Sequence, residues 1–466
     1  MILQVYLKKI LNDHNFLSLA ANFSTAVMGL LSFMILLRML SIPDLGKWIL
    51  FTAPASLIDM LRFGLTRDAL VRFLTTPDEK EKKCLLGSSW LIGLAILLII
   101  SILIWIVLLA IPQKLASSGY DLFFIWYPLL ALVNLPWNYS WSILQANLEF
   151  KKIFWIRFFN LCSFLLIIFS FYLIKKINVR DVVLIYIATN LMTSLFCLGK
   201  KWTGIQFFNH HTKKCIHELI SFGRYSMFTR VGSSLLKGAD SFIISFSSFM
   251  GPTGVALYAI PLKFIELIEI PLISFATTAY PKLSRASVEN NIPEFRKIFY
   301  SYTGAVIYLF IAIAIVSFFL KKYFIIFLGG SNYLSALDDL AIILIPFIIY
   351  SVLLPLDRFT GISLDSLNKP HKNLIKLIFM ASFNIIGDIV VIFGFHYFFP
   401  GLSVTALLFS VAVVSCLFAV IGIVIGYYYL YQEVKISFLT IFSSGIYVYK
   451  NLFTRLIHPE TQNQEK

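Results

Sequence analysis

The segment LLGSSWLIGLAILLIISILIWIVLLAIP, residues 85–112, contains no charged side chain. It exceeds the ~18 consecutive apolar residues that identify a membrane-crossing helix. Similar runs recur from one end of the chain to the other, and over all 466 residues 59% are hydrophobic and only 14% are charged. Soluble globular proteins contain about a quarter charged residues, so the sequence predicts an all-α protein that crosses the membrane many times.

Breaks between the apolar runs separate twelve candidate helices. Their expected ranges are 14–40, 43–74, 85–112, 122–146, 153–174, 182–200, 217–249, 253–283, 295–320, 334–367, 371–397 and 401–431. Of the Lys and Arg residues counted in the termini and connections, 23 lie on one side and eight on the other. Because cytoplasmic loops carry the excess of Lys and Arg, we expect both termini to be cytoplasmic. The connection KKINVRD, residues 175–181, holds three of the eight and fits this topology least well.

Weak internal similarity divides the chain into two halves of six helices. SIPDLGKWILF (41–51) is similar to FMGPTGVALYAI (249–260), and each precedes the second helix of its half. ILQANLEFKK (143–152) corresponds in the same way to SLDSLNKPHK (363–372). Repeated halves that meet around a central site are typical of secondary transporters.

These observations predict four segments along the chain. They are an N-terminal six-helix half, a cytoplasmic linker, a C-terminal six-helix half and a cytoplasmic tail, at residues 1–200, 201–216, 217–431 and 432–466. In the tail, apolar residues recur at helical spacing beside Lys450 and Arg455. We therefore expect an amphipathic helix that lies on the inner leaflet of the membrane.

Several stretches together resemble the polysaccharide-exporter (oligosaccharide flippase) branch of the multidrug/oligosaccharidyl-lipid/polysaccharide flippase superfamily. They are DLGKW, DMLRFGLTRDALVRFL, ISFGRYS, ADSFIIS, GPTGVALYAIPLKF, ATTAYPKLS, GGSNYLSALDDLAIIL and LDSLNKPHKN. The resemblance covers most of the chain and rests on the order and spacing of these stretches. It implies a V-shaped transporter of twelve helices with a central cavity, which moves undecaprenyl-pyrophosphate-linked oligosaccharide across the bacterial cytoplasmic membrane.

The seventh helix carries charges in an apolar setting. In RVGSSLLKGADSF, residues 230–242, the polar side chains recur at steps of three and four and so share one helix face. A charge at the centre of a bilayer costs about 2.5–3.5 kcal/mol on insertion scales, so this face is expected to meet protein or water.

Charged side chains recur at similar depth on other helices. The cationic candidates for binding the pyrophosphate are Arg62, Arg230, Lys237, Lys263 and Arg358. The acidic candidates for binding a coupling proton or Na⁺ are Asp59, Asp240, Glu266, Glu269, Asp357 and Asp388. Arg suits phosphate because its planar fork makes paired hydrogen bonds, and Lys provides a point charge.

Pairing inside a helix is the alternative interpretation of these charges. Lys237 with Asp240, Asp59 with Arg62, and Lys263 with Glu266 are i,i+3 pairs that can neutralise one another. Both interpretations stand for these pairs. Arg230 and Glu269 have no oppositely charged residue within one turn, so we expect each to meet another helix, an ion or a substrate.

The remaining motifs argue against catalysis and cofactors. The helix connections are too short for a catalytic domain, and no GxxxxGK[ST] nucleotide motif occurs. HHTKKCIH, residues 210–217, lacks an established zinc spacing. The five cysteines are scattered without CxxC, so we expect no disulfide. We predict no metal, no cofactor and no enzyme activity.

Together with the charged residues at membrane depth, the resemblance implies an ion-coupled flippase for the repeat unit of a surface polysaccharide such as O-antigen, lipopolysaccharide or capsule. Its partners would be the lipid-linked oligosaccharide, a proton or Na⁺, membrane lipids, a polysaccharide polymerase and glycosyltransferases, with no role for nucleic acid. An antiporter for drugs or cations is the first alternative. A membrane-embedded glycosyltransferase or polymerase is the second.

Overall fold

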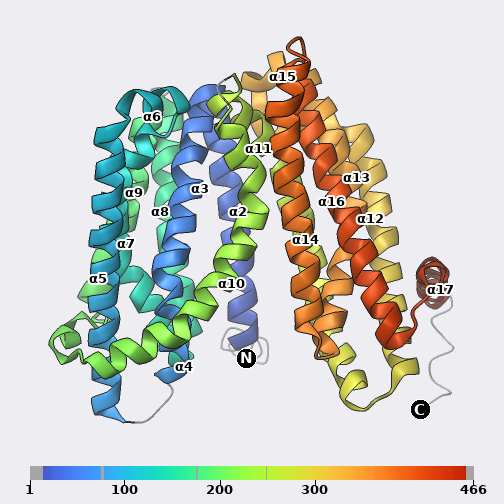
Figure 1. Ribbon diagram of the computed structural model, residues 1–466, viewed down its shortest axis with the longest axis horizontal. Helices are drawn as coiled ribbons and strands as arrows, with labels where there is room; N and C mark the ends of the chain where they lie inside the picture. Colours follow the sequence, from blue (N-terminus) through green and yellow to red (C-terminus); the bar gives the residue numbers. More distant parts are fainter. Residues whose placement is uncertain (1–13, 75–77, 175–176, 248, 458–466) are drawn as a thin grey trace, which may run out of the picture. The chain divides into compact units, whose positions relative to one another are not determined.

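A computed structural model describes the backbone of residues 14–74, 78–174, 177–247 and 249–457 (Figure 1). Within these ranges, side chains are described except at 14–24, 225–226, 228–231, 233–237, 452–453 and 455–457. The described residues form helices and no strand. The chain is an all-α, polytopic membrane protein.

A long helix occupies each of the twelve expected ranges. These helices are α2 (His14–Met39), α3 (Ile42–Gly64), α5 (Glu79–Ala110), α7 (Asp121–Ala146), α8 (Phe150–Ile174), α9 (Val179–Gly199), α10 (Lys213–Ser245), α11 (Gly251–Val288), α12 (Ile292–Gly329), α13 (Leu337–Ser366), α14 (Pro370–Ile389) and α16 (Val404–Val434). Short elements connect them: α4 (Arg67–Phe73), α6 (Pro112–Ser118), η1 (Ile205–His210), η2 (Gly330–Ala336), the π-helical turn η3 (Val390–Phe395) and α15 (His396–Phe398). The tail forms α17 (Phe438–Ile457).

Length and apolarity alone identify fewer spans than these twelve helices. Seven described helical stretches are long and apolar enough to cross a membrane, and one of them, Ile292–Ser366, covers both α12 and α13. An eighth results if α6 and α7, which are bent by 99°, count as one span. Helices α10 and α11 are not among these stretches, and they carry many of the charges singled out above.

The second expected helix is interrupted. The sequence predicted one helix over 43–74, whereas α3 ends at Gly64 and α4 begins at Arg67. The turn packs closely on α10, because a Cβ atom added to Gly223 would lie 1.8 Å from the carbonyl oxygen of Leu65. Gly64, Thr66, Arg67 and Asp68 lie at this turn, so the sequence held a local signal of the break that the expected range passed over.

By their contacts, the helices form two compact units. Unit 1 extends to Gly238 and includes a short segment that ends at Ala256. Unit 2 comprises Ala239–Ser247 and the chain from Leu257 onward. Helix α10 is therefore divided between the units, with most of its length in unit 1 and its last turns in unit 2.

Two turns, 220 residues apart, have the same backbone conformation. Leu148 between α7 and α8 has φ 58°, and Asn368 between α13 and α14 has φ 60°. The hydrogen bonds agree as well, since Leu148 N donates to Gln145 O and Asn368 N donates to Asp365 O, each over 3.1 Å. This left-handed conformation is rare for residues other than glycine. Its repetition in corresponding turns supports the internal similarity of the two sequences.

The segment between α9 and α10 folds against α5. The indole of Trp90 donates a 2.8 Å hydrogen bond to Thr203 O. Gly87 allows η1 to approach, because a Cβ atom there would lie 2.4 Å from Phe207 O. The expected linker is thus a packed part of unit 1.

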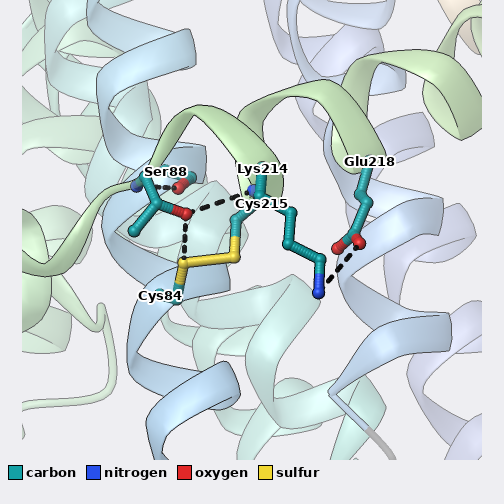
Figure 2. Close-up of a disulfide and its surroundings, with 6 residues drawn as sticks. Cys84, Ser88, Lys214, Cys215 and Glu218 are labelled. Atoms are coloured by element: carbon teal, nitrogen blue, oxygen red, sulfur yellow. Dashed lines mark hydrogen bonds and ion pairs between the residues drawn. A yellow bond between two sulfur atoms is a disulfide. The ribbon is translucent and has the colours of Figure 1, made fainter.

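A disulfide joins Cys84 of α5 to Cys215 of α10 (Figure 2). The expectation of no disulfide was wrong. The two cysteines are 131 residues apart in the sequence, and packing of the linker on α5 brings them together. Short-range cysteine spacing carries no signal of such a pair.

Helix α17 runs across the long helices of unit 2 and packs on α12 (Figure 1). Its contact depends on glycine, because a Cβ atom on Gly304 would lie 2.3 Å from Ile441 O and 2.7 Å from Gly445 N. Tyr449 also donates a 2.9 Å hydrogen bond to Ala305 O. The tail helix is therefore a docked part of unit 2, and its inner-leaflet location stays a prediction.

We expect Gly304→Val to loosen α17, because the new side chain overpacks a backbone contact at a cost of roughly 1–3 kcal/mol. The measurement is the rate at which trypsin cleaves the purified protein at Lys450, which should rise several-fold. Gly199→Val is the matched control, since a Cβ atom at Gly199 has no neighbour within 4 Å. Equal cleavage of both variants and the parent would show that α17 does not depend on this contact.

Candidate functional site

Asp240 is at the centre of a buried polar cluster in unit 2. Its carboxylate accepts hydrogen bonds from Tyr258 of α11 (2.7 Å), Asn384 of α14 (2.6 Å) and Ser415 of α16 (3.1 Å). Asp388 of α14 lies close enough for its carboxyl group to interact electrostatically with that of Asp240. The cluster thus joins four helices and contains two acidic side chains.

The second carboxyl group of this cluster has no hydrogen-bond donor among the described residues. Asp388 is fully buried, and none of the described residues donates to either of its oxygens. The side-chain oxygen of Asn384 is likewise without a described donor. Buried charge is costly unless it is paired, and hard cations such as Na⁺ prefer oxygen ligands. These oxygen atoms are therefore suited to a proton or a small hard cation.

The local sequence explains why the cluster forms. Asn384 and Asp388 are four residues apart and share one face of α14. Gly387 lets that helix approach α16, because a Cβ atom there would lie 2.6 Å from Val414. The π-helical turn η3 begins directly after α14. Such turns are rare and often occur at functional sites.

A second carboxylate cluster lies in unit 1. Asp59 of α3 accepts hydrogen bonds from Tyr127 and Asn134 of α7, each over 2.9 Å. The Nε atom of Arg62 lies 3.7 Å from the Asp59 carboxylate, and its guanidinium group lies over the ring of Phe63. The expected i,i+3 pair is present here, and it is buried, because the side chain of Arg62 is only 1% exposed.

Helix α11 carries the other expected pair. Lys263 donates a 2.5 Å hydrogen bond to Glu266, whose side chain is 62% exposed. Glu269, one turn further on, is half-buried. Together with Asp240 and Asp357 it acts electrostatically on Tyr350 of α13, which places these three acidic residues in the same region of unit 2.

Asp357 of α13 has a cationic partner that the sequence did not predict. Lys376 of α14 is 2% exposed and donates to the Asp357 carboxylate over 2.7 Å and to Thr360 Oγ1 over 3.3 Å. Asp357 is thus part of an interhelical ion pair. Arg358, the next residue, is exposed.

Two expected site residues cannot be placed beyond their backbone. Arg230 and Lys237 are on α10, but their side chains lie outside the described residues. The pairing of Lys237 with Asp240 and the partner of Arg230 therefore stay predictions.

Several polar residues of these clusters were not expected from the sequence. Tyr127, Asn134, Tyr258, Ser415 and Lys376 complete the two carboxylate clusters and the ion pair. The i,i+4 spacing of Asn384 and Asp388 was a usable signal. A single tyrosine or serine in an apolar helix has no such signal, because its partner is on another helix.

Comparison with known proteins places the chain in a family. The family described as polysaccharide biosynthesis protein matches residues 13–287, more than half of the chain. The chain belongs to this family. Membership confirms the resemblance inferred from the order of the sequence stretches. No curated protein matches the chain.

Solved structures share the fold at low sequence identity. A multidrug resistance MATE family transporter of the MOP superfamily, in an inward-facing conformation, matches with a TM-score of 0.71 and 16% identity over 88% of this chain and 96% of its own. The lipid II flippase MurJ, in an inward closed conformation, matches with a TM-score of 0.69 and 16% identity over 95% and 93%. A mutant of the Vibrio cholerae MATE transporter VcmN matches with a TM-score of 0.53 and 16% identity over 92% and 98%.

These matches show that the chain has the fold of the MOP superfamily. The three proteins are transporters or a flippase, and none is named as an enzyme. The fold therefore agrees with the predicted fold class, a polytopic bundle of about twelve helices.

Proposed function

We propose that this polysaccharide biosynthesis protein flips undecaprenyl-pyrophosphate-linked oligosaccharide across the bacterial cytoplasmic membrane, coupled to a proton or Na⁺. The observation that carries the coupling is the Asp240–Asp388 cluster, where the Asp240 carboxylate accepts from three neutral donors and lies near a second buried carboxyl group to which no described residue donates. Family membership supports a role in surface polysaccharide export, such as that of an O-antigen or capsule repeat unit. Both termini face the cytoplasm, and the membrane supplies the lipid carrier.

Ion binding drives transport if it favours one conformation over another. A cation at Asp240 and Asp388 relieves the repulsion of two buried charges, so it stabilises the conformation in which they are close. A conformation that separates them binds the ion less well. On the side of the membrane with the higher ion concentration the ion-bound conformation is therefore more populated, and on the other side it is less populated.

The cationic candidates would bind the pyrophosphate. Of those whose side chains are described, Arg358 is exposed and the Lys263 side chain is 20% exposed, so both retain access to a ligand. Arg62 is buried against Asp59 and suits a role in positioning that carboxylate. Arg230 and Lys237 complete the proposed set. Export would be followed by a polymerase and preceded by glycosyltransferases that build the repeat unit.

Reconstitution tests this function directly. In proteoliposomes with a fluorescent undecaprenyl-pyrophosphate oligosaccharide inside, a Na⁺ or proton gradient is expected to raise the fraction accessible to an external enzyme. In cells, deletion of the gene should leave the lipid-linked precursor at the inner face. Gradient-driven efflux of a drug or cation without movement of the glycolipid would instead identify an antiporter. Sugar transfer by the purified protein would identify an enzyme.

A further inference from the structure

We propose that Cys84 and Cys215 form a reversible redox site, oxidised by peroxide and reduced by a dithiol, that fastens the start of α10 to α5. The pair has a Cα–Cα distance of 6.3 Å, inside the ~4.4–6.8 Å range of protein disulfides. Both cysteines lie in unit 1. The proposal goes beyond the transport function and does not depend on it.

The charge distribution assigns this end of unit 1 to the cytoplasm. Lys82 and Lys83 precede Cys84, and Lys213 and Lys214 precede Cys215. Cytoplasmic thiols are kept reduced, so disulfides there are usually transient and redox-sensing. A cysteine pair at bonding distance on this side is therefore better suited to reversible oxidation than to a permanent structural disulfide.

The surroundings favour thiol reactivity. Cys215 lies in the first turn of α10, where the helix N-terminus stabilises a thiolate. The hydroxyl of Thr212 lies 2.9 Å from the sulfur of Cys84 and can donate to it. Cys84 is half-buried whereas Cys215 is only 5% exposed, so peroxide reaches Cys84 first.

Oxidation proceeds in two balanced steps. The Cys84 thiolate attacks hydrogen peroxide, which breaks the O–O bond, leaves a sulfenic acid and releases hydroxide, which takes up the thiol proton as water. The Cys215 sulfur then attacks the Cys84 sulfur, forms the S–S bond and releases a second water molecule. Two thiols and one peroxide thus give one disulfide and two waters. A cytoplasmic dithiol reverses the reaction by exchange and becomes a disulfide itself.

The disulfide changes how the first turns of α10 are held. Without it, the described polar links between this end of α10 and α5 are the 3.3 Å hydrogen bond from Thr212 N to Ser88 Oγ and the 2.9 Å contact of the Thr212 hydroxyl with the sulfur of Cys84. Further along the helix Leu219 is fully buried, and the ring of Phe222 lies 5.6 Å from that of Phe73 and under the guanidinium group of Arg72. Oxidation therefore adds a covalent restraint to the first turns of α10, ahead of Leu219, and reduction removes it.

Differential thiol labelling tests the site in the full-length protein in its native membrane. One sample is treated with hydrogen peroxide and one is not, and the free thiols of each are then blocked with a light maleimide. The cysteines that were oxidised are next reduced and labelled with a heavy maleimide. Mass spectrometry then measures the ratio of light to heavy label on the peptides that contain Cys84 and Cys215. Before treatment, Cys84 and Cys215 should carry the light label. After treatment, light labelling of both should fall at least about fivefold, with recovery after a dithiol.

Two variants and a second measurement complete the test. Cys84→Ser should leave Cys215 reduced after peroxide, and Cys162→Ser, a half-buried cysteine on α8, should change nothing. Amide hydrogen exchange of residues 213–218 should slow about tenfold on oxidation of the parent and not of Cys84→Ser.

Three results would each overturn the proposal. The cysteines could stay light-labelled in peroxide, or be already disulfide-bonded in untreated cells and unresponsive to the dithiol. Oxidation could also leave hydrogen exchange unchanged. None of these readouts requires transport, so failure here is distinct from failure of the flippase.

Discussion

Asp388→Asn is expected to abolish ion-driven export while leaving the protein folded. The asparagine side chain has the same shape as aspartate but no charge, so the cluster keeps only the Asp240 carboxylate and loses the pair of carboxyl groups that a proton or Na⁺ would neutralise. Removing a buried charge without described donors should not destabilise the fold. Gradient-driven flipping in proteoliposomes should fall at least about tenfold, because conformational bias scales with the difference in ion affinity.

The matched control for this change is Asp339→Asn, at an exposed position of α13, which should export at the parent rate. Separate Na⁺ and pH gradients identify the ion, since only the coupled ion should drive the parent protein. If Asp388→Asn responds to both gradients as the parent does, the cluster has no role in coupling. Its carboxyl groups would then serve helix packing alone.

The second large effect is on stability. Lys376→Met is expected to destabilise unit 2 by about 3–5 kcal/mol, because it leaves the Asp357 carboxylate in a largely buried site without its cation. Lys376 is 2% exposed, and its ammonium group also donates to the Asp357 carbonyl and to Thr360. The measurement is the thermal unfolding of the purified protein in detergent.

The double variant Lys376→Met with Asp357→Asn separates the two roles of Asp357. If the ion pair is structural, the double variant should recover most of the stability, and the coupling energy between the two positions should be large. If Asp357 instead binds the coupling ion, Asp357→Asn alone should block export at unchanged stability. Equal unfolding temperatures for Lys376→Met and the parent would contradict the structural interpretation.

The sequence predicted the helices well because burial in a membrane leaves a strong local signal. All but the last two residues of the run at 85–112 lie within α5, and the expected range 153–174 lies within α8. The interruption after Gly64 was missed although Thr66, Arg67 and Asp68 follow it, because the expected range ran through these polar residues to the next break. The turn itself packs on Gly223 of another helix. Hydropathy reports the solvent around a segment and not the neighbour it packs against.

The candidate sites were predicted in part for the same reason. The pairs Asp59–Arg62 and Lys263–Glu266 follow from helical spacing alone. Lys376 and Asp357 are 19 residues apart on different helices, so no local pattern joins them. Asp240 stood out as a charge in an apolar helix, but its three hydrogen-bond donors come from three other helices. Such partners become visible only when the fold is known.

The division of α10 between the two units limits how the chain can be divided into fragments. The boundary after Gly238 falls inside a continuous helix, and a segment ending at Ala256 returns to unit 1. No single cut of the polypeptide releases either unit whole. A chimera that exchanges one half of the sequence for that of a relative would therefore contain parts of both units from each parent. The two parent proteins must have compatible packing residues along α10 and the first turns of α11.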